Sequence, residues 1–358
     1  MSTSWFEDVL ALPQGERRDL FEVTAERLGT VASYIEKDLW VCHVLDCLWN
    51  RRPDGHPGLV FKGGTSLSKV YDLIGRFSED IDVVIDRAGL GFAEGDDPTT
   101  ATDLTNKKRT KLFESLRSAS SEYVEGSLQE ALRGTVAGPI RLEMDDGDAS
   151  RQTLLVYYDS LFTDGADGYV APRVKIEAGA RSGVEPLETG TVMPYVADDL
   201  PNGGDMSVGG LTVLSPKRTF LEKALILHGL SCGYRDGGRT PKDADRISRH
   251  YHDVALMVPT EIGRAAMADE DLLASVREHN LIAFRQAWKK FEEAVPGTIR
   301  LVPEGELLAA LDRDYDAMQG MTIGDPPSLD WVIEQLGLAE EALNATGPSA
   351  AADLSEGP

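Results

Sequence analysis

The sequence has few cysteines, no long hydrophobic run and no export signal. Cys42, Cys47 and Cys232 are an odd number without metal-ligand spacing, so we expect reduced thiols rather than disulfides or a zinc site. No apolar run approaches the ~20 residues that span a bilayer, so we expect no membrane partner. Residues 1–8 lack the basic start and apolar core of a signal peptide. We therefore expect a cytoplasmic protein.

Positive charge is also scarce. The chain has 36 Lys and Arg against 60 Asp and Glu, a formal net charge of -24. Because phosphate contacts need positive charge, this balance disfavours diffuse nucleic-acid binding and leaves local basic clusters as the places to expect it. Each cluster is either an RNA-binding site or a solvated helix face. The clusters are Lys107, Lys108, Arg109 and Lys111, and then Arg235, Arg239, Lys242, Arg246 and Arg249.

Two familiar phosphate motifs are absent. The chain has no G-x-x-x-x-G-K-[ST] and no G-x-G-x-x-G, which excludes a P-loop and a dinucleotide fingerprint. What stands in their place is a Gly63-Gly64-Thr65-Ser66 turn that leads into a helical pattern. Glycines let the backbone approach a ligand closely, and the N–H groups of a helix start favour a phosphate.

An apolar run with two carboxylates follows this turn. In a strand, Asp80 and Asp82 at i and i+2 project from the same face. Two adjacent carboxylates repel unless a cation lies between them, and hard oxygen ligands favour Mg²⁺ or Mn²⁺. Each part alone is common, but a glycine turn, a short helix and then Asp-x-Asp in this order predict a nucleotidyltransferase that uses a nucleoside triphosphate.

A third carboxylate can join the pair. The alternating run 173–177 predicts a strand on which Lys175 and Glu177 share one face. This strand can pair beside the Asp80 and Asp82 strand, so Glu177 is a candidate third metal ligand. The alternative is a solvated polar face on an edge strand.

The chain of 358 residues, 42% hydrophobic, can form one large or two medium domains. Apolar spacing predicts helices up to about residue 48, of which the one over 35–48 is amphipathic. It also predicts strands at 59–61 and 81–85, with a helix over 66–73 between them. A helix over 104–132, strands at 140–144, 153–158 and 173–177, and helices from 216 to 345 follow. We expect domains at 1–210 and 211–346 and a disordered tail at 347–358.

Two charged residues fall within apolar helical patterns of the second half. Lys223 follows Glu222 in the run 218–228, and Asp253 precedes the apolar run up to Met257. A lysine or an aspartate that is buried in a helical core must either pair with an opposite charge or contact a ligand. They form either a structural ion pair or a contact with a triphosphate or its metal.

Taken together, these segments resemble the AbiEii/AbiGii nucleotidyltransferase toxins of bacterial toxin–antitoxin and abortive-infection systems. The resemblance runs from about Tyr34 to Asn344. It implies an α+β fold: a DNA polymerase β-like nucleotidyltransferase domain with a mixed sheet flanked by helices, plus a helical C-terminal lobe. It also implies a cognate antitoxin and a role in phage defence. The segments that carry it are Phe61–Lys69, Arg76–Asp82, Lys175–Glu177, Arg218–Lys223 and Arg249–Asp253.

The resemblance also implies roles for residues. Asp80 and Asp82 match the metal-binding carboxylates, and Lys223 and Asp253 match the later lysine and aspartate motifs of the family. Glu177 joins them as a catalytic residue and metal ligand. The nucleotide-binding residues implied are Lys62, Gly63, Gly64, Thr65, Ser66, Arg76, Ser78 and Lys175. A longer segment at 231–245 and an Asp-rich insert at 86–103 leave the acceptor open.

Three functions compete at this point. The first is a toxin that moves a nucleotide from an NTP to an RNA 3′ end, with tRNA as the expected acceptor, and so blocks translation. The second keeps the chemistry but modifies a protein or a small molecule, which the acidic composition favours. The third is a non-catalytic module that binds a nucleotide or a partner. The Asp80 and Asp82 pair argues against the third, since a module without catalysis needs no two adjacent carboxylates.

Overall fold

The computed structural model describes residues 5–162, 171–200, 203–242 and 246–345. These residues form two compact units, one up to Leu214 and one from Ser215 onward. The expected boundary between residues 210 and 211 therefore falls within the last strand of the first unit, β7 (Val208–Leu214). The tail expected to be disordered, 347–358, lies outside the described residues.

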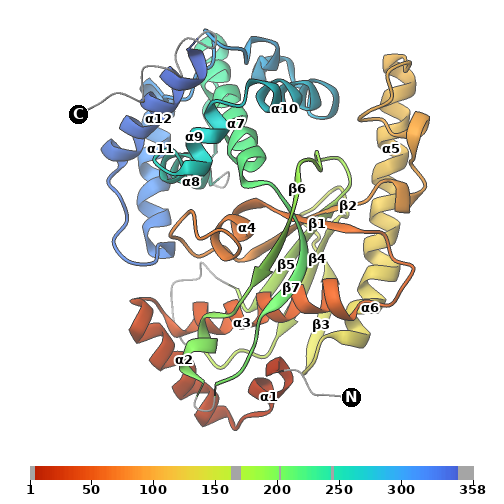
Figure 1. The fold of residues 1–358 in the computed structure, drawn as a ribbon, viewed down its shortest axis with the longest axis vertical. Helices are drawn as coiled ribbons and strands as arrows, with labels where there is room; N and C mark the ends of the chain where they lie inside the picture. Colours follow the sequence, from red (N-terminus) through yellow and green to blue (C-terminus); the bar gives the residue numbers. More distant parts are fainter. Residues whose placement is uncertain (1–4, 163–170, 201–202, 243–245, 346–358) are drawn as a thin grey trace. The chain divides into compact units, whose positions relative to one another are not determined.

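The first unit is built on a seven-stranded sheet with the order β3-β4-β5-β2-β1-β7-β6 (Figure 1). The pairs β2·β5 and β1·β7 are parallel and the other neighbours are antiparallel. This mixed sheet with its helices confirms the expected α+β class. The other strands are β1 (Leu59–Lys62), β2 (Asp80–Ile85), β3 (Ile140–Met144), β4 (Thr153–Tyr158), β5 (Arg173–Gly179) and β6 (Leu187–Val192).

All five expected strands are present, but β6 and β7 were not expected. The pattern of β6 is exposed at four of its six positions, and β7 contains the pair Gly209 and Gly210. Polar residues and glycines are weak strand formers, so local propensity is low in β6 and at the start of β7. The largely apolar run 211–214 in the second half of β7 is a strand signal that the sequence analysis passed over. Pairing with β1 and with each other supplies the stabilisation that the local sequence lacks.

The helices of the first unit lie around this sheet. α4 starts three residues before the expected helix at 66–73 and ends at Lys69. The long helix expected over 104–132 is present but contains a π-helical turn, Val124–Leu128. The helices are α1 (Trp5–Ala11), α2 (Gln14–Leu28), α3 (Ala32–Asp46), α4 (Gly63–Lys69), α5 (Asn106–Tyr123) and α6 (Gln129–Thr135).

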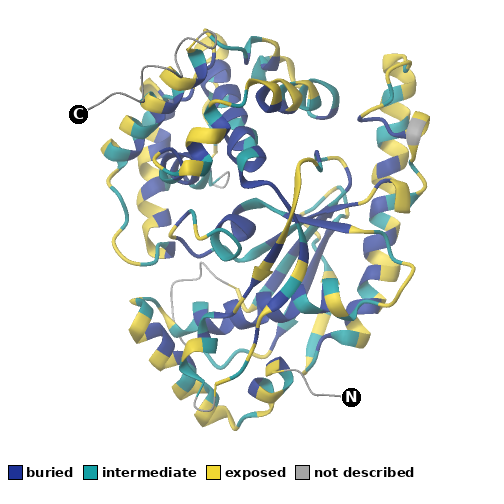
Figure 2. Ribbon diagram, viewed as in Figure 1, coloured by how far each residue is buried: buried dark blue, intermediate teal, exposed yellow. Residues whose placement is uncertain are grey.

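The α3 helix lies at the centre of the core. Every residue from Ile35 to Leu45 is buried, and Figure 2 shows most of this helix in the buried colour. Its apolar side chains join one cluster with those of β2 and β5, including Val83 and Ile176. The sequence predicts an amphipathic helix here, which is wrong, because α3 is covered on all sides. Its three consecutive charged residues, Glu36, Lys37 and Asp38, are therefore buried as well.

The second unit is helical in the part that the structure describes, as expected. α7 continues to Gly237, where Gly238 in the left-handed conformation (φ 60°) ends it, so the connection in 231–245 is shorter than the sequence suggests. No described helix is long and apolar enough to cross a membrane. The helices are α7 (Pro216–Gly237), α8 (Ser248–Met257), α9 (Glu261–Met267), α10 (Glu270–Ala283), α11 (Gly305–Met318) and α12 (Leu329–Asn344).

Candidate active site on the polar face of the sheet

The β2 strand presents its two aspartates on one face of the sheet. Asp80 and Asp82 are half-buried, while Ile81 and Val83 between and after them are buried on the opposite face. This alternation is the period of two that places i and i+2 together. The expected side-by-side placement of the two carboxylates thus follows from the strand itself.

The neighbouring strands add two lysines and a third carboxylate to the same face. Along the parallel pair β2·β5, Asp80 lies opposite Lys175 and Asp82 lies opposite Glu177. On the other side, β1 places Lys62 opposite Asp82. Partners that lie directly opposite each other in a sheet project from the same face. Asp82 therefore has a lysine beside it on β1 and a glutamate beside it on β5.

Gly63 is positioned directly against Asp82. Its φ is 83°, and a Cβ on it would lie 2.0 Å from Asp82 Oδ2. Only glycine tolerates both the left-handed backbone and this approach without displacement. The carboxylate of Asp82 therefore packs on the backbone at the start of α4.

The rest of the glycine motif is hydrogen-bonded to the segment that precedes β2. The Thr65 hydroxyl donates to the backbone oxygen of Asp80 and lies 2.9 Å from Ser78 Oγ. A Cβ on Gly64 would lie 2.8 Å from Arg76 Nη2 and 2.9 Å from Ser78 Oγ. The residues predicted to bind nucleotide here are thus brought together in space.

The Ser66 hydroxyl donates to the backbone oxygen of Gly63 over 3.0 Å, and both Thr65 and Ser66 are fully buried. These hydroxyls hold the loop in shape. The α4 helix has only seven residues, which limits its macrodipole. Most of the positive charge that would neutralise a triphosphate must therefore come from side chains.

A cavity of about 430 Å³ opens over this face of the sheet, within the size range of ligand pockets. Lys62, Asp82, Lys175 and Glu177 are among the residues that line it. Polar residues that the sequence analysis did not single out complete the lining: Asp145, Asp148, Ser150, Gln152, Thr153 and Ser182. The run of aspartates and a glycine at 145–148, in the turn between β3 and β4, is the sequence signal for this wall.

Asp148 shapes that wall. Its carboxylate accepts hydrogen bonds from the backbone N–H groups of Ser150 and Gln152, each at 2.8 Å, and from the Thr153 hydroxyl at 2.8 Å. Burial alone would raise its pKa, but these donors lower the pKa of Asp148 to about 2. The turn into β4 is thereby fixed beside the cavity.

Glu177 is held by a lysine. Its Oε1 lies 2.5 Å from Lys175 Nζ. Burial alone would lower the pKa of Lys175, but the hydrogen bond and charge of Glu177, with Asp80 nearby, raise it. Lys175 therefore stays protonated beside the two aspartates.

The donor set fits a divalent cation that binds together with a nucleotide. Among the described residues, no group of three or more His, Cys, Asp or Glu side chains is arranged to hold a metal ion. Mg²⁺ commonly takes one or two carboxylates and completes its shell with water and substrate phosphates. Asp80 and Asp82 would supply those two carboxylates, while Glu177 is paired with Lys175.

Two buried ion pairs join the site to α3. Lys69, the last residue of α4, lies 2.7 Å from Asp38, and Lys37 pairs with Glu79, the residue before Asp80. Asp38 also accepts the backbone N–H of Tyr195 at 2.7 Å. Burial alone would lower the pKa of Lys69, but the facing carboxylate of Asp38 raises it. The α3 helix thus fixes both ends of the glycine and aspartate motifs.

Lys223 and Asp253 pair with each other in the second unit. Lys223 Nζ lies 3.0 Å from Asp253 Oδ2, and their side chains are 9% and 0% exposed. The pair joins α7 to α8 inside the helical unit. The structural alternative for these two residues is therefore observed, and their contact with a triphosphate stays a prediction.

Some of the predicted RNA-binding residues make contacts within the fold, and others are exposed to solvent. Arg109 donates to the backbone oxygens of Pro98 and Ala101 and so closes the Asp-rich insert. Arg235 pairs with Asp236 and Glu293. Arg239 lies over the Trp288 ring, 5.6 Å from its centroid. The exposed members are Lys107, Lys108, Lys111, Arg235, Arg239 and Lys242, and Arg246 and Arg249 are half-buried.

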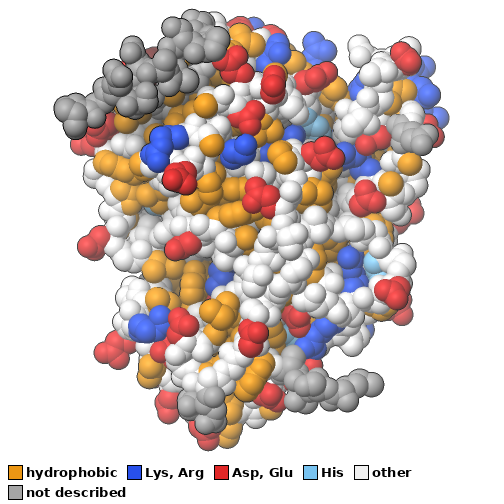
Figure 3. All heavy atoms as spheres, in the orientation of Figure 1, with side chains coloured by type: hydrophobic (Ala, Val, Ile, Leu, Met, Phe, Trp, Pro, Cys, Tyr) orange, Lys and Arg blue, Asp and Glu red, His pale blue; other side chains and the backbone are white. Residues whose placement is uncertain are grey.

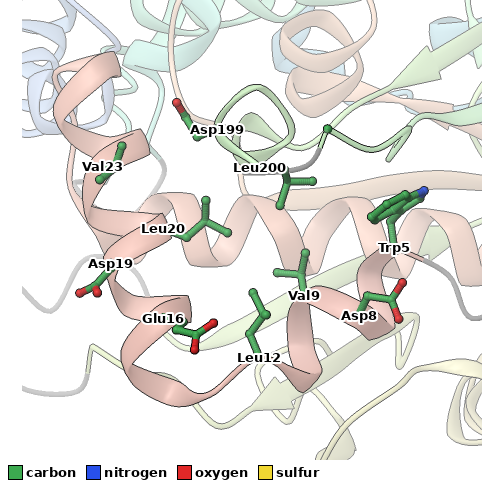
Figure 4. Close-up of a pocket in the computed structure, with 11 residues that line it drawn as sticks. Trp5, Asp8, Val9, Leu12, Glu16, Asp19, Leu20, Val23, Asp199 and Leu200 are labelled. Carbon is green, nitrogen blue, oxygen red and sulfur yellow. The ribbon is translucent and has the colours of Figure 1, made fainter.

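On the face drawn in Figure 3, Lys and Arg side chains lie among Asp and Glu side chains. A second cavity, of about 500 Å³, lies between the N-terminal helices and the segment near Leu200 (Figure 4). Its lining is apolar or acidic: Trp5, Asp8, Val9, Leu12, Glu16, Asp19, Leu20, Val23, Asp199, Leu200 and Gly203. Without a cationic side chain in that lining, it does not suit a triphosphate.

Known proteins give a direct comparison. The family model described as "Nucleotidyl transferase AbiEii toxin, Type IV TA system" matches residues 46–335, which is most of the chain. A solved structure of MenT4, a nucleotidyltransferase toxin from Mycobacterium tuberculosis H37Rv, is similar over 92% of this chain and 99% of that chain. It has 16% sequence identity and a TM-score of 0.44, and we draw no conclusion from it. No curated protein matches the chain.

The matched region contains all five segments that carry the resemblance seen in the sequence. It confirms that resemblance and the prediction of an enzyme. The chain belongs to the AbiEii nucleotidyltransferase family, the toxins of type IV toxin–antitoxin systems.

Proposed function

We propose that this toxin transfers a nucleoside monophosphate from an NTP to the 3′ hydroxyl of an RNA, with the tRNA 3′ end as acceptor. A tRNA modified in this way would block translation in the cytoplasm. The cognate antitoxin would counteract the toxin there. The observation that carries the proposal is the row of Asp82, Lys62 and Glu177 across β1, β2 and β5 at a nucleotide-sized cavity. Family membership supports the NTP substrate and the antitoxin partner.

Asp80 and Asp82 would hold Mg²⁺ or Mn²⁺. Bound there, the ion supplies positive charge to the triphosphate and lowers the pKa of the acceptor hydroxyl. Lys62 and Lys175, on the same face, balance the charge of the phosphates. Gly63 and Gly64 let those phosphates approach the backbone. The acceptor oxygen bonds to the α-phosphorus as the bond to pyrophosphate breaks, so positioning and electrostatics carry most of the catalysis.

Three further residues have proposed roles. Glu177 completes the metal shell or accepts the proton of the acceptor hydroxyl. Lys223 balances charge on the β- and γ-phosphates, and Asp253, 3.0 Å from it, orients it. These roles apply to side chains that the fold already pairs, so each needs a kinetic test separate from stability.

A second acceptor class competes with RNA. The net charge of -24 and the mixed charges on the face in Figure 3 favour a protein or a small molecule over a long nucleic acid. We therefore test the acceptor directly. The protein is incubated with Mg²⁺, total RNA, cell protein and each of the four labelled NTPs in turn, and the products are separated by class.

The proposal predicts label on RNA, removed by treatments that release the 3′ nucleotide, and strongest in the tRNA fraction. Label on protein or on a small molecule with none on RNA would replace the RNA acceptor by the second class. Binding of NTP with no labelled product of any class would contradict the enzymatic proposal.

A further inference from the structure

Beside the two aspartates lies a cross-strand row of two arginines and a tyrosine. Arg141 on β3 lies opposite Tyr157 on β4, which lies opposite Arg173 on β5. Arg173 precedes Lys175 and Glu177 by two and four residues, so all three share one face of β5. The row therefore lies on the same face of the sheet as Asp80 and Asp82.

The row is close to the proposed reaction centre. Asp80 lies opposite Lys175, which is two residues along β5 from Arg173. Two residues of strand correspond to about 6.8 Å. Arg173 is therefore separated from Asp80 by two residues along β5 and by one strand spacing across the sheet.

The three side chains contact one another. The Arg141 guanidinium carbon lies 4.0 Å from the centroid of the Tyr157 ring. Arg173 Nη1 donates to the Tyr157 hydroxyl at 3.0 Å, and the Arg173 guanidinium carbon is 5.7 Å from the ring centroid. The Arg141 side chain is 57% exposed. The ring and its two guanidinium groups form a cationic, aromatic surface on the sheet.

This combination suits one ligand in particular. Proteins recognise single-stranded RNA by stacking its bases on aromatic rings and guanidinium planes and by contacting its phosphates with arginine. Lys62 and Lys175 on the same face are assigned to the phosphates of the NTP, so Arg141 and Arg173 add positive charge beside them for a second phosphate-bearing ligand. We propose that Arg141, Tyr157 and Arg173 bind the single-stranded segment next to the acceptor 3′ end. The inference rests on the proposed function and assigns its RNA subsite.

A structural role competes with this one. Cross-strand pairs stabilise sheets, and charged side chains on an edge strand such as β3 discourage pairing with other chains. Arg141 also forms an ion pair with Glu143. A purely structural row would contribute to the melting temperature but not to RNA affinity, so the two roles differ in what they change.

The test uses full-length protein and three variants of the row, Arg141→Gln, Tyr157→Leu and Arg173→Gln. Arg151→Gln is the matched control, because Arg151 is also an exposed arginine in an ion pair, with Glu125 at 2.6 Å, but lies outside the row. Tyr157→Phe is the conservative variant, which keeps the ring. For each, kcat and KM are measured for NTP and for an RNA with a single-stranded 3′ end, together with the melting temperature.

We expect the KM for RNA to rise about tenfold in each row variant, with KM for NTP and kcat at saturating RNA unchanged. Each lost arginine should reduce the slope of log KM against log salt by about 0.7. Arg151→Gln and Tyr157→Phe should behave like the wild type. A lower melting temperature with an unchanged KM for RNA would overturn the inference in favour of the structural role.

Failure of the proposed function gives a different result. In that case the unmodified protein itself transfers no nucleotide to RNA, whatever its variants do. Wild-type transfer to RNA together with row variants that match Arg151→Gln in KM for RNA would leave the function standing and overturn only the RNA subsite.

Discussion

Gly63 shows how strongly one position can be constrained by its neighbour. It has a left-handed backbone, and its α-carbon faces the carboxylate of Asp82 at a distance that leaves no room for a methyl group. A methyl at this position would have to displace Asp82 from the place where a cation is expected. The position of a predicted metal ligand is thus constrained by the lack of a side chain at Gly63.

Gly63→Ala should therefore reduce nucleotide transfer by two or more orders of magnitude, since small displacements of reacting groups cost about 10²-fold. The measurement is kcat with saturating NTP. The control is Gly55→Ala, because Gly55 has a similar φ of 91° but nothing within 4 Å of an added Cβ. Equal loss of activity in both variants would attribute the effect to backbone strain and not to Asp82.

Lys223→Met separates pairing from catalysis at a second residue. The substitution keeps an apolar stem but leaves Asp253 as a fully buried carboxylate that has lost its 3.0 Å partner. Removal of one partner of a buried pair costs about 3–5 kcal/mol. We expect a large drop in the free energy of unfolding, measured by denaturant titration.

The double variant Lys223→Met/Asp253→Leu should recover much of that stability, because no buried charge is left without its partner. If Lys223 also serves the triphosphate, the double variant will be stable but will show a raised KM for NTP. A stable double variant with wild-type kinetics would show that the pair is structural only.

At the scale of elements, α3 is the part of the fold that holds the site in place. Glu36, Lys37 and Asp38 on this helix each bind a different segment: Leu161, Glu79 and Lys69. Two of those segments carry the glycine motif and the aspartate pair. A helix that is buried on all sides can fix several loops at once, which an amphipathic helix on the surface cannot.

A histidine on the same helix, His43, leads us to expect that the free energy of unfolding depends on pH. His43 is fully buried, and its Nε2 accepts the backbone N–H of Ala137 at 2.9 Å. Burial, assisted by the nearby charge of Arg51, lowers its pKa from 6.5 to about 4. The unfolded chain therefore binds a proton more readily than the folded chain between these values. The stability is fully present above pH 6.5 and is lost as the pH falls toward 4.

This shift corresponds to about 3 kcal/mol of stability lost across that window. His43→Gln, which keeps an acceptor but does not titrate, should be less stable at pH 7 yet show a flatter decline between pH 6.5 and 4. Unfolding free energies measured at several pH values check this. Parallel curves for the two proteins would contradict the assignment to His43.

How far the sequence predicts this fold depends on where each element gets its stabilisation. The strand β4 is continuously apolar, and the strand β5 alternates between polar and apolar residues. Both patterns can be recognised in the sequence, and both strands were expected. The strand β6 has four exposed residues and is held by pairing with β7. Long-range pairing of this kind leaves no local pattern, so β6 was missed. The strand β7 was missed although its second half, 211–214, is largely apolar.

The residues of the candidate site also fall into two groups, those that a local pattern predicts and those that only the fold brings together. Gly63, Asp80 and Asp82 lie within twenty residues of one another, so their order alone indicates nucleotide chemistry. Asp148 and Lys37 reach the site from distant segments, through the cavity wall and the α3 ion pairs. Only the sheet register and the buried helix, which depend on tertiary packing, bring them there.

At the scale of the whole molecule, the net charge limits where a polyanion such as RNA could bind. With a net charge of -24, the chain repels a polyanion except where arginine and lysine gather. Arg239→Glu combined with Lys242→Glu tests the basic segment of the second unit, where both side chains are exposed. If RNA contacts this segment, the variant will have a raised KM for RNA, an unchanged KM for NTP and a shallower salt dependence.

The matched control for that variant is Lys107→Glu combined with Lys108→Glu on α5, which changes the net charge by the same amount. Equal effects of both pairs would show that RNA binding does not distinguish the basic segment of the second unit from the basic cluster on α5. An effect of neither pair would leave the sheet face as the remaining candidate for RNA contact.

The central claim is that Asp80 and Asp82 carry nucleotide transfer to an RNA 3′ end. The most direct measurement compares Asp82→Asn with the wild type in the transfer of labelled NTP to RNA, with Asp86→Asn as the control. Asp86 follows the same strand but is exposed and accepts the backbone N–H of Gly89. We predict 3′-terminal labelling of RNA by the wild type and by Asp86→Asn, and none by a folded Asp82→Asn. Undiminished labelling by folded Asp82→Asn would contradict the account.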